Sequence, residues 1–227
     1  MAGAASLAVL AMAGCASAPS GEQQVQQLDK AAIARLKAAP SLFISPSGQP
    51  FRAAPGEAYP VTAWFAQVDQ NHDGRIDRAE FRADAEAFFK VLDRNHDGVI
   101  DGFELSYYEH DVAPEILGAY RGGAMGDTQA EPGAGHARGE HERGPRGRQP
   151  DVLGLQGAVA FELFSKPEPV AAADLQVDGH ITQAEFLTSA NRDFDTLDKA
   201  GKGYLTLDDL PKTPLQAALE GDKKGKR

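Results

Sequence analysis

The chain has 227 residues, with 33 Asp and Glu against 23 Lys and Arg, which gives a formal net charge of −10. This acidic balance argues against nucleic-acid binding, which requires basic surfaces. The single cysteine, Cys15, has no partner in the chain for a disulfide bond.

Residues 1–14 form an apolar run without a charged side chain, and the run stops at Cys15. It is shorter than the roughly 20 apolar residues that cross a bilayer, so we expect a signal peptide. Residues 12–15 (Met-Ala-Gly-Cys) resemble a bacterial lipobox, which implies cleavage before Cys15 and its lipidation. Ala16 in place of aspartate then implies an anchor in the outer membrane of the bacterial envelope, facing the periplasm. No basic residue precedes the run, so we expect the true start upstream; a soluble chain with an Ala-rich N-terminus is the alternative.

Residues 15–59 are expected to contain the lipid anchor, an amphipathic helix and a turn-rich extension. The helix is predicted over residues 22–39 because apolar residues recur on one side. These residues are Val25, Leu28, Ile33 and Leu36. The stretch 42–52 (LFISPSGQPFR) predicts a hairpin or turn-rich extension.

The segment 60–120 contains two twelve-residue loops, loop 1 (69–80) and loop 2 (93–104), and both match D-x-[DN]-x-[DN]-G-x5-E. Such a loop offers oxygens at positions 1, 3, 5, 7, 9 and 12, and hard cations take six to eight. The donors of loop 1 are Asp69, Asn71, Asp73, the Arg75 carbonyl, Asp77 and Glu80. Those of loop 2 are Asp93, Asn95, Asp97, the Val99 carbonyl, Asp101 and Glu104.

The two loops resemble the EF-hand family, because carboxylates, glycine, apolar residue and closing glutamate all fall in place twice. The resemblance implies helix–loop–helix repeats that bind Ca²⁺. Pro60 suits the first turn of the helix that enters loop 1 and carries Trp64, Phe65 and Val68. Tyr107 and Tyr108 follow loop 2, and we expect their hydroxyl groups at the surface.

Residues 121–150 are rich in Gly, Pro and charge and contain few apolar residues, which predicts a disordered linker. The segment 151–213 then repeats the first half, because residues 75–105 align without a gap on residues 180–210. Identities such as Phe81/Phe186, Ala85/Ala190 and Phe89/Phe194 lie outside the loop donors and favour internal duplication. Residues 214–227 are assigned to a basic tail.

The duplication adds loop 3 (174–185) and loop 4 (198–209), and both depart from the pattern. Loop 3 predicts a weaker metal site, since Gln176 stands at position 3 and Thr182 replaces the aspartate of position 9. Its donors are Asp174, Gln176, Asp178, the His180 carbonyl, Thr182 and Glu185. Loop 4 has Ala200 at position 3 and Lys202 at position 5; an ammonium group has no lone pair to donate. We therefore expect loop 4 to be a packing partner without an ion.

Only twelve residues separate loop 1 from loop 2, and loop 3 from loop 4. One helix, over residues 81–92 in the first half, must therefore leave one loop and enter the next, with Phe81, Ala85, Phe88, Phe89 and Leu92 in the core. The loops of one half then lie at opposite ends of this helix, so we expect loop 1 to pair with loop 4 and loop 2 with loop 3. In the second half, Pro167 and Pro169 shorten the entering helix. The predicted fold is all-α, with two duplicated halves that share one helix between adjacent loops.

The spacing also resembles the lanmodulin family of periplasmic lanthanide-binding proteins. Aspartate at position 9 gives loops 1 and 2 four carboxylates each, which favours a trivalent ion. Gln70 and Arg94 stand where that family has proline, so calcium is preferred and a lanthanide ion is the alternative.

We expect a calcium sensor, a buffer or a calcium-stabilised module in a bacterial envelope lipoprotein, or else a surface-anchored interaction protein. The expected partners are the metal ion, the membrane through the lipid anchor, and a protein that the sequence does not identify. An enzyme is not expected: the sequence has no G-x-S-x-G motif, and His72 and His96 lie at solvent-facing loop positions.

Overall fold

The computed structural model describes residues 30–117, 153 and 155–221. The predicted signal peptide, Cys15 and the predicted linker at 121–150 lie outside these residues. Of the predicted amphipathic helix, the structure describes α2 (Lys30–Ala38). Among the described residues, no helix is both long and apolar enough to cross a membrane.

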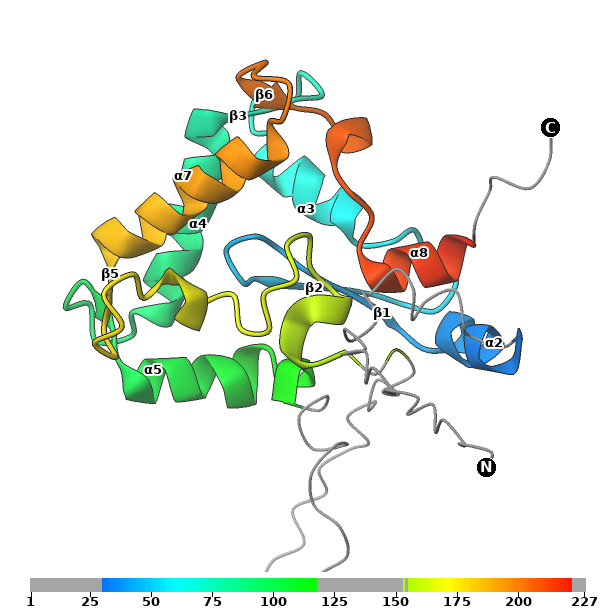
Figure 1. Ribbon diagram of the computed structural model, residues 1–227, viewed down its shortest axis with the longest axis horizontal. Coiled ribbons are helices and arrows are strands. Elements are labelled where there is room, and N and C mark those ends of the chain that lie inside the picture. The colour runs from blue at the N-terminus through cyan, green and yellow to red at the C-terminus, as the bar shows by residue number, and fades with distance from the viewer. Residues whose placement is uncertain (1–29, 118–152, 154, 222–227) are drawn as a thin grey trace, which may run out of the picture.

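Two antiparallel helices form the centre of the molecule, α4 (Arg78–Leu92) and α7 (Gln183–Leu197), one from each half. They lie side by side in Figure 1 and make the most extensive helix–helix contact in the described part of the chain. Their facing aromatic side chains meet edge to face, Phe81 with Phe194 and Phe89 with Phe186. The five residues predicted as the core face of α4 are all buried, and the prediction of one shared helix is confirmed.

Short strands join the two ends of this helix pair. Strand β3 (Ile76–Asp77) of loop 1 pairs with β6 (Tyr204–Leu205) of loop 4, and β4 (Val99–Ile100) of loop 2 pairs with β5 (Ile181–Thr182) of loop 3, both antiparallel. This confirms the predicted cross-pairing of the loops. Figure 1 shows the β3–β6 pair at the top and the loop 2 and loop 3 pair at the lower left, at opposite ends of α4.

Helices and turns flank the loops. Helix α3 (Val61–Val68) enters loop 1 from Pro60 and buries Trp64, Phe65 and Val68, as predicted. Helix α5 (Gly102–Tyr107) leaves loop 2 and continues into a π-helical turn, η1 (Tyr108–Val112). In the second half, 3-10 turns η2 (Gly157–Ala160) and η3 (Ala171–Ala173) precede loop 3, and η4 (Leu207–Asp209) ends loop 4.

The predicted hairpin is present, but it lies in the core and is not an extension. Strand β1 (Ser41–Ile44) pairs with β2 (Pro50–Ala53), and Leu42, Phe43 and Ile44 are at most 1% exposed. The Phe43 ring contacts Trp64 of α3, and the Ile44 N–H donates to the carbonyl of Phe161 at the end of η2. The apolar strand of this hairpin is therefore not available to a partner. The all-α prediction holds only in part, because the described residues form three two-stranded sheets.

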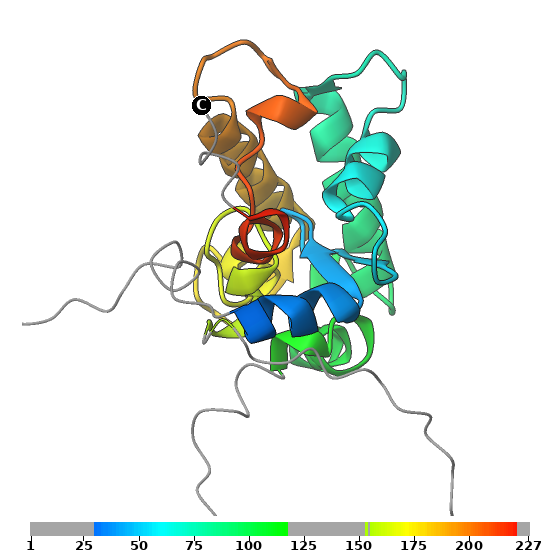
Figure 2. The same cartoon turned by 90° about the vertical axis from the view of Figure 1, so that its right-hand side faces the viewer.

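Two further predictions are corrected by the packing around the hairpin. Residues predicted to begin the basic tail form helix α8 (Pro214–Glu220), with Leu215 and Ala218 buried. Figure 2 shows α8 next to α2. The Tyr59 hydroxyl donates to the Leu42 carbonyl and contacts the Thr213 hydroxyl, which caps α8. Tyr108 is fully buried and does not face the surface. Its buried hydroxyl is satisfied because it donates to the Gly48 carbonyl in the hairpin turn.

Candidate metal centre

Loop 1 connects α3 to α4, and its backbone amides orient the donor side chains. Asp69, at position 1, is 6% exposed, and its two carboxylate oxygens accept from the N–H groups of Asp73 and Gly74 at 3.1 and 2.9 Å. Asn71 Oδ1 accepts from Asp73 N–H at 2.8 Å, and Asp73 Oδ1 from Arg75 N–H at 2.9 Å. Gly74 has φ +79°, a left-handed conformation that suits glycine at this sharp turn. Three donor side chains are thus held by the loop's own backbone.

The last two donors of loop 1 also start helix α4. Asp77 is the N-cap, and its carboxylate accepts from the Glu80 N–H at 2.9 Å, while Glu80 Oε2 accepts from the Asp77 N–H at 3.0 Å. Such a reciprocal capping box stabilises a helix start. Glu80 Oε1 reaches across the loop to the N–H groups of Gln70 and Asn71. The closing glutamate therefore links both ends of loop 1.

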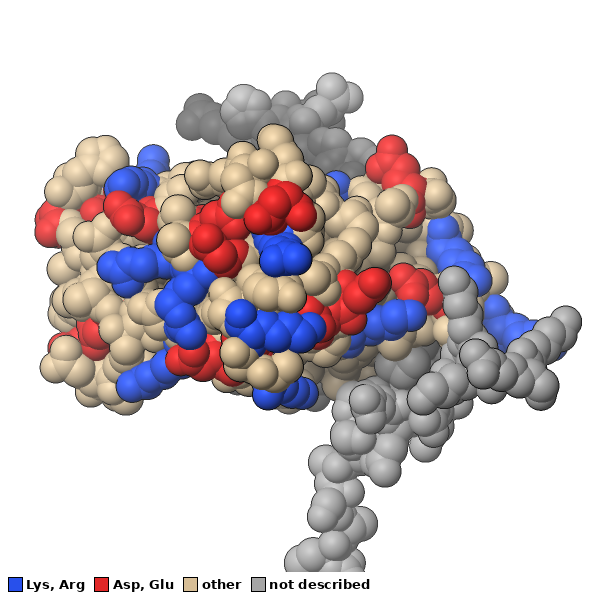
Figure 3. Space-filling model, turned by 90° about the horizontal axis from the view of Figure 1, so that it is seen from above, with Lys and Arg blue, Asp and Glu red and all other residues tan. Residues whose placement is uncertain are grey.

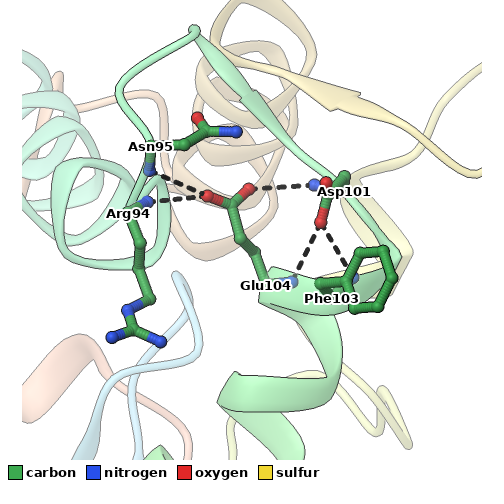
Figure 4. Close-up of a pocket in the computed structure, with 5 residues that line it drawn as sticks. All are labelled: Arg94, Asn95, Asp101, Phe103 and Glu104. Atoms are coloured by element: carbon green, nitrogen blue, oxygen red, sulfur yellow. Dashed lines mark hydrogen bonds between the residues drawn. The ribbon is translucent and has the colours of Figure 1, made fainter.

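Loop 2 repeats this arrangement with more burial of the closing glutamate. Glu104 is 6% exposed; Oε1 accepts from Arg94 N–H at 2.7 Å and Asn95 N–H, and Oε2 accepts from Asp101 N–H at 3.1 Å (Figure 4). A hollow of about 310 Å³ lies beside these residues and Phe103. The Arg94 guanidinium points away from the carboxylates and lies 4.4 Å from the centre of the Tyr107 ring.

The other donors of loop 2 keep the contacts of loop 1. Asp93 is 6% exposed and accepts from the N–H groups of Asp97 and Gly98. Asn95 Oδ1 accepts from Asp97 N–H, and Asp97 Oδ1 from Val99 N–H, at 2.9 Å each. In both loops, the side chains that the sequence predicts as ligands therefore accept hydrogen bonds from the backbone of their own loop.

The donors of loops 1 and 2 fit a hard cation by their chemistry. Each loop directs four carboxylates and one amide oxygen to its own backbone, and a carboxylate has about four acceptor sites, more than these N–H groups use. In the part of the chain that the structure describes, no three His, Cys, Asp or Glu side chains meet closely enough to hold an ion. The closing glutamates instead bind the amides at positions 2 and 3, so an ion would compete with those N–H groups for them.

Loop 3 has the same backbone course but fewer charges. Asp174 accepts from the Val177 and Gly179 N–H groups at 2.6 and 2.9 Å, and the hydrogen bond from Gly179 is the main cause that lowers the pKa of Asp174. Glu185 accepts from the hydroxyl and N–H of Thr182 and from the Gln176 amide, and these bonds lower its pKa. Asp178 Oδ1 accepts from His180 N–H at 3.0 Å. Three carboxylates remain as anionic donors.

Loop 4 contains a basic group among its acids. Lys202, at position 5, donates from Nζ to Asp209 Oδ1 at 2.8 Å, which joins positions 5 and 12. This hydrogen bond is the main cause that lowers the pKa of Asp209 to about 2 and raises the pKa of Lys202. Asp198, at position 1, accepts from the N–H groups of Lys202 and Gly203.

Two segments of the chain match the family model described as EF hand, at residues 61–83 and 85–106. The match supports an EF-hand calcium-binding family. The first segment covers α3, loop 1 and the start of α4, and the second covers α4 from residue 85 onward, loop 2 and most of α5. Comparison with curated proteins and with solved structures finds no match.

The EF-hand pattern predicts the ligands but not the residues that support them. The sequence interpretation missed the stacking of Arg94, at position 2 of loop 2, on Tyr107, three residues after the closing glutamate. It also excluded an ion from loop 4 without recognising the partner of Lys202. The signal was present: an acid at position 12 remains where the acid at position 5 has become lysine.

Proposed function

We propose that loops 1 and 2 bind Ca²⁺ and that binding stabilises the contact between the two halves of the chain. The observation that carries this proposal is the cross-pairing: β3 of loop 1 pairs with β6, and β4 of loop 2 pairs with β5. Each proposed site thus lies in a loop whose short strand is hydrogen-bonded to a strand of the other half. Bound calcium supplies positive charge among carboxylates that otherwise repel one another.

The buried core favours a calcium-stabilised module over a sensor. Sensor EF hands open an apolar groove when they bind calcium. Here Phe81, Phe89, Phe186 and Phe194 are at most 4% exposed and contact one another across the two halves. Opening this contact would expose the centre of the core. We therefore propose that the free energy of calcium binding stabilises the folded protein and does not open a groove.

Loop 3 is proposed as a weaker third site, and loop 4 as a loop without a metal ion. We rank the expected affinities by the number of carboxylate donors, which is four in each of loops 1 and 2 and three in loop 3. We also propose that residues 1–14 are a signal peptide and that lipidated Cys15 anchors the protein in the bacterial envelope. This context rests on the sequence of residues 1–16 alone. We assign no catalytic role to His72 and His96, which are exposed.

A lanthanide ion is the second candidate ligand. It is supported by the four carboxylates that each of loops 1 and 2 directs to its own backbone, since a trivalent ion gains more than a divalent ion from that charge. Calcium is preferred because the match is to an EF-hand family and because Gln70 and Arg94 stand at position 2.

Calorimetric titration of the full-length chain with Ca²⁺, and separately with La³⁺, tests the proposal. Glu80→Gln and Glu104→Gln should each remove one calcium equivalent, because the neutral amide cannot act as a bidentate anionic ligand. Glu86→Gln is the matched control, since Glu86 lies on α4 outside both loops and pairs with Lys90.

The outcomes separate the alternatives. Lanthanum binding that is orders of magnitude tighter, with calcium needed at millimolar levels, would favour lanthanide handling. Heats that are the same in the wild type and both loop variants would contradict metal binding at these sites. Circular dichroism with and without a chelator distinguishes the roles: a stabilised module keeps nearly all of its helical signal, whereas a sensor or buffer shows a metal-dependent change.

A further inference from the structure

Loop 4 keeps the shape of a metal-binding loop without the donors. Gly203 at position 6 has φ +78°, close to the +79° of Gly74 in loop 1. The Asp198 carboxylate accepts from Gly203 N–H at 2.7 Å, as Asp69 accepts from Gly74 N–H at 2.9 Å. The loop therefore needs another interaction to stabilise this shape, because Ala200 stands in place of the asparagine at position 3 and Lys202 in place of the aspartate at position 5.

The ammonium group of Lys202 provides a positive charge in this loop. It donates to Asp209 Oδ1 at 2.8 Å, and the other Asp209 oxygen accepts from the N–H and hydroxyl of Thr206 at 3.0 and 2.7 Å. Asp198 at position 1 lies close enough to contribute to the raised pKa of Lys202. The ammonium thus pairs with the acid of position 12, which is the last ligand in an occupied loop.

Contacts extend from this charge to loop 1. The Tyr204 ring, at position 7 of loop 4, lies 5.9 Å from Lys202 Nζ and 4.3 Å from the Arg75 guanidinium, measured to the ring centre. Arg75 is the residue whose carbonyl is the position 7 donor of loop 1. Tyr204 also pairs with Asp77, the position 9 donor, across the β3–β6 ladder. Loop 4 therefore touches two donor residues of loop 1.

We propose that Lys202 is a tethered cation that takes the place of the metal ion in loop 4 and holds this loop in its closed shape. Loop 1 is then paired with a partner that is ordered without metal. Loop 3, the partner of loop 2, has Asp178 at position 5, so the opposite end of the molecule has no such cation in this position. The effect on loop 1 rests on the proposed function; the effect on loop 4 does not.

The charges on this end of the molecule allow a test that separates a general charge effect from a specific effect of Lys202. Figure 3 shows acidic and basic side chains interspersed on the face above β3 and β6. Removing any lysine here makes the surroundings of loop 1 more negative, which by itself favours calcium. If Lys202 is a tethered cation, its removal should instead weaken calcium binding by loop 1, because loss of the ammonium loosens loop 4, the partner of loop 1.

The experiment uses full-length chains with Glu104→Gln and Glu185→Gln, so that loop 1 is the remaining proposed site. In this background Lys202→Met should weaken calcium binding by about two- to fivefold, the range expected when one exposed ion pair is lost. Lys199→Met, at position 2 of the same loop, removes the same charge and should leave the affinity unchanged or tighter. Equal or tighter binding by Lys202→Met would overturn the proposal.

Thermal unfolding in the presence of a chelator tests the effect on loop 4 without metal. Lys202→Met should lower the melting temperature by about 2 °C relative to Lys199→Met. Equal melting temperatures would overturn the tethered cation. If the wild-type chain gave no binding heat at loop 1, the proposed function would fail there, and the melting comparison would still decide the role of Lys202.

Discussion

Val177 has a backbone conformation that is unfavourable for its side chain. It lies at position 4 of loop 3 with φ +57°, where loops 1 and 2 have His72 and His96 at φ +58° and +61°. A left-handed conformation is rare for β-branched residues and is tolerated by asparagine. Val177 is also 86% exposed, so burial does not compensate for this conformation.

Val177→Asn should therefore stabilise the protein by about 0.5–1 kcal/mol, because asparagine adopts the left-handed region at lower cost. Urea unfolding in the presence of a chelator measures the change. His72→Asn is the matched control at the same position of loop 1 and should change the free energy of unfolding less. A loss of stability in Val177→Asn would show that the conformation is not strained.

Helix α4 connects loop 1 to loop 2 and makes its most extensive contact with α7 of the other half. Phe89 is 1% exposed and its ring centre lies 5.5 Å from that of Phe186 on α7, whereas Val91 on the same helix is 56% exposed. We therefore expect Phe89→Ala to destabilise the protein by about 3–5 kcal/mol, since it removes a buried ring and leaves a cavity. Val91→Ala should change stability by about 0.5 kcal/mol or less.

Chemical denaturation of both variants checks this prediction. A similar small effect for both would mean that α4 and α7 do not depend on this contact. A large effect for both would mean that Val91 has a partner which its exposure conceals.

Elements with a strong local pattern could be predicted from the sequence, and elements that depend on distant partners could not. Helix α4 and the pairing of loop 1 with loop 4 follow from the twelve-residue spacing and from apolar residues at helical intervals. The buried position of β1 does not, because its contacts with Trp64 and Phe161 join segments far apart in the chain. Helix α8 was missed although its start has a local signal: the Thr213 hydroxyl caps it by accepting from Gln216 N–H, and Pro214 stands in the first turn. The loop ligands stay a prediction, and this prediction needs no distant contact because twelve consecutive residues contain the whole donor pattern.

At the scale of the whole molecule, two glutamates outside the loops link stability to pH, Glu162, which is buried, and Glu168, which is half-buried. Burial raises the pKa of Glu162 and of Glu168 to about 7, against backbone hydrogen bonds that lower it. Glu162 is 2% exposed and accepts from the N–H groups of Phe164 and Lys166. The Lys166 ammonium and the Asp193 carboxylate are the nearby charges, and they form an ion pair at 2.7 Å.

The folded protein keeps a proton on Glu162 between pH 4.5 and about 7, where the unfolded chain has lost it. Stability due to this group is therefore fully present below pH 4.5 and is lost as the pH rises to about 7. The loss is up to about 3 kcal/mol. Glu162→Gln should reduce the difference in unfolding free energy between pH 5 and pH 8, measured by urea unfolding with a chelator. The same difference in both proteins would contradict the burial effect.

Because loop 1 pairs with loop 4 and loop 2 with loop 3, the loops and the two central helices form a closed ring of contacts, called here the circuit. Starting in loop 1, one can follow α4 to loop 2, cross to loop 3, follow α7 to loop 4 and cross back to loop 1. A single break between residues 121 and 150 would leave this circuit intact, because neither fragment could leave without breaking both strand pairs and the α4–α7 contact. We therefore expect the two fragments to stay associated after cleavage of the chain between the halves, and to reassemble through the same strand pairs and helix contact.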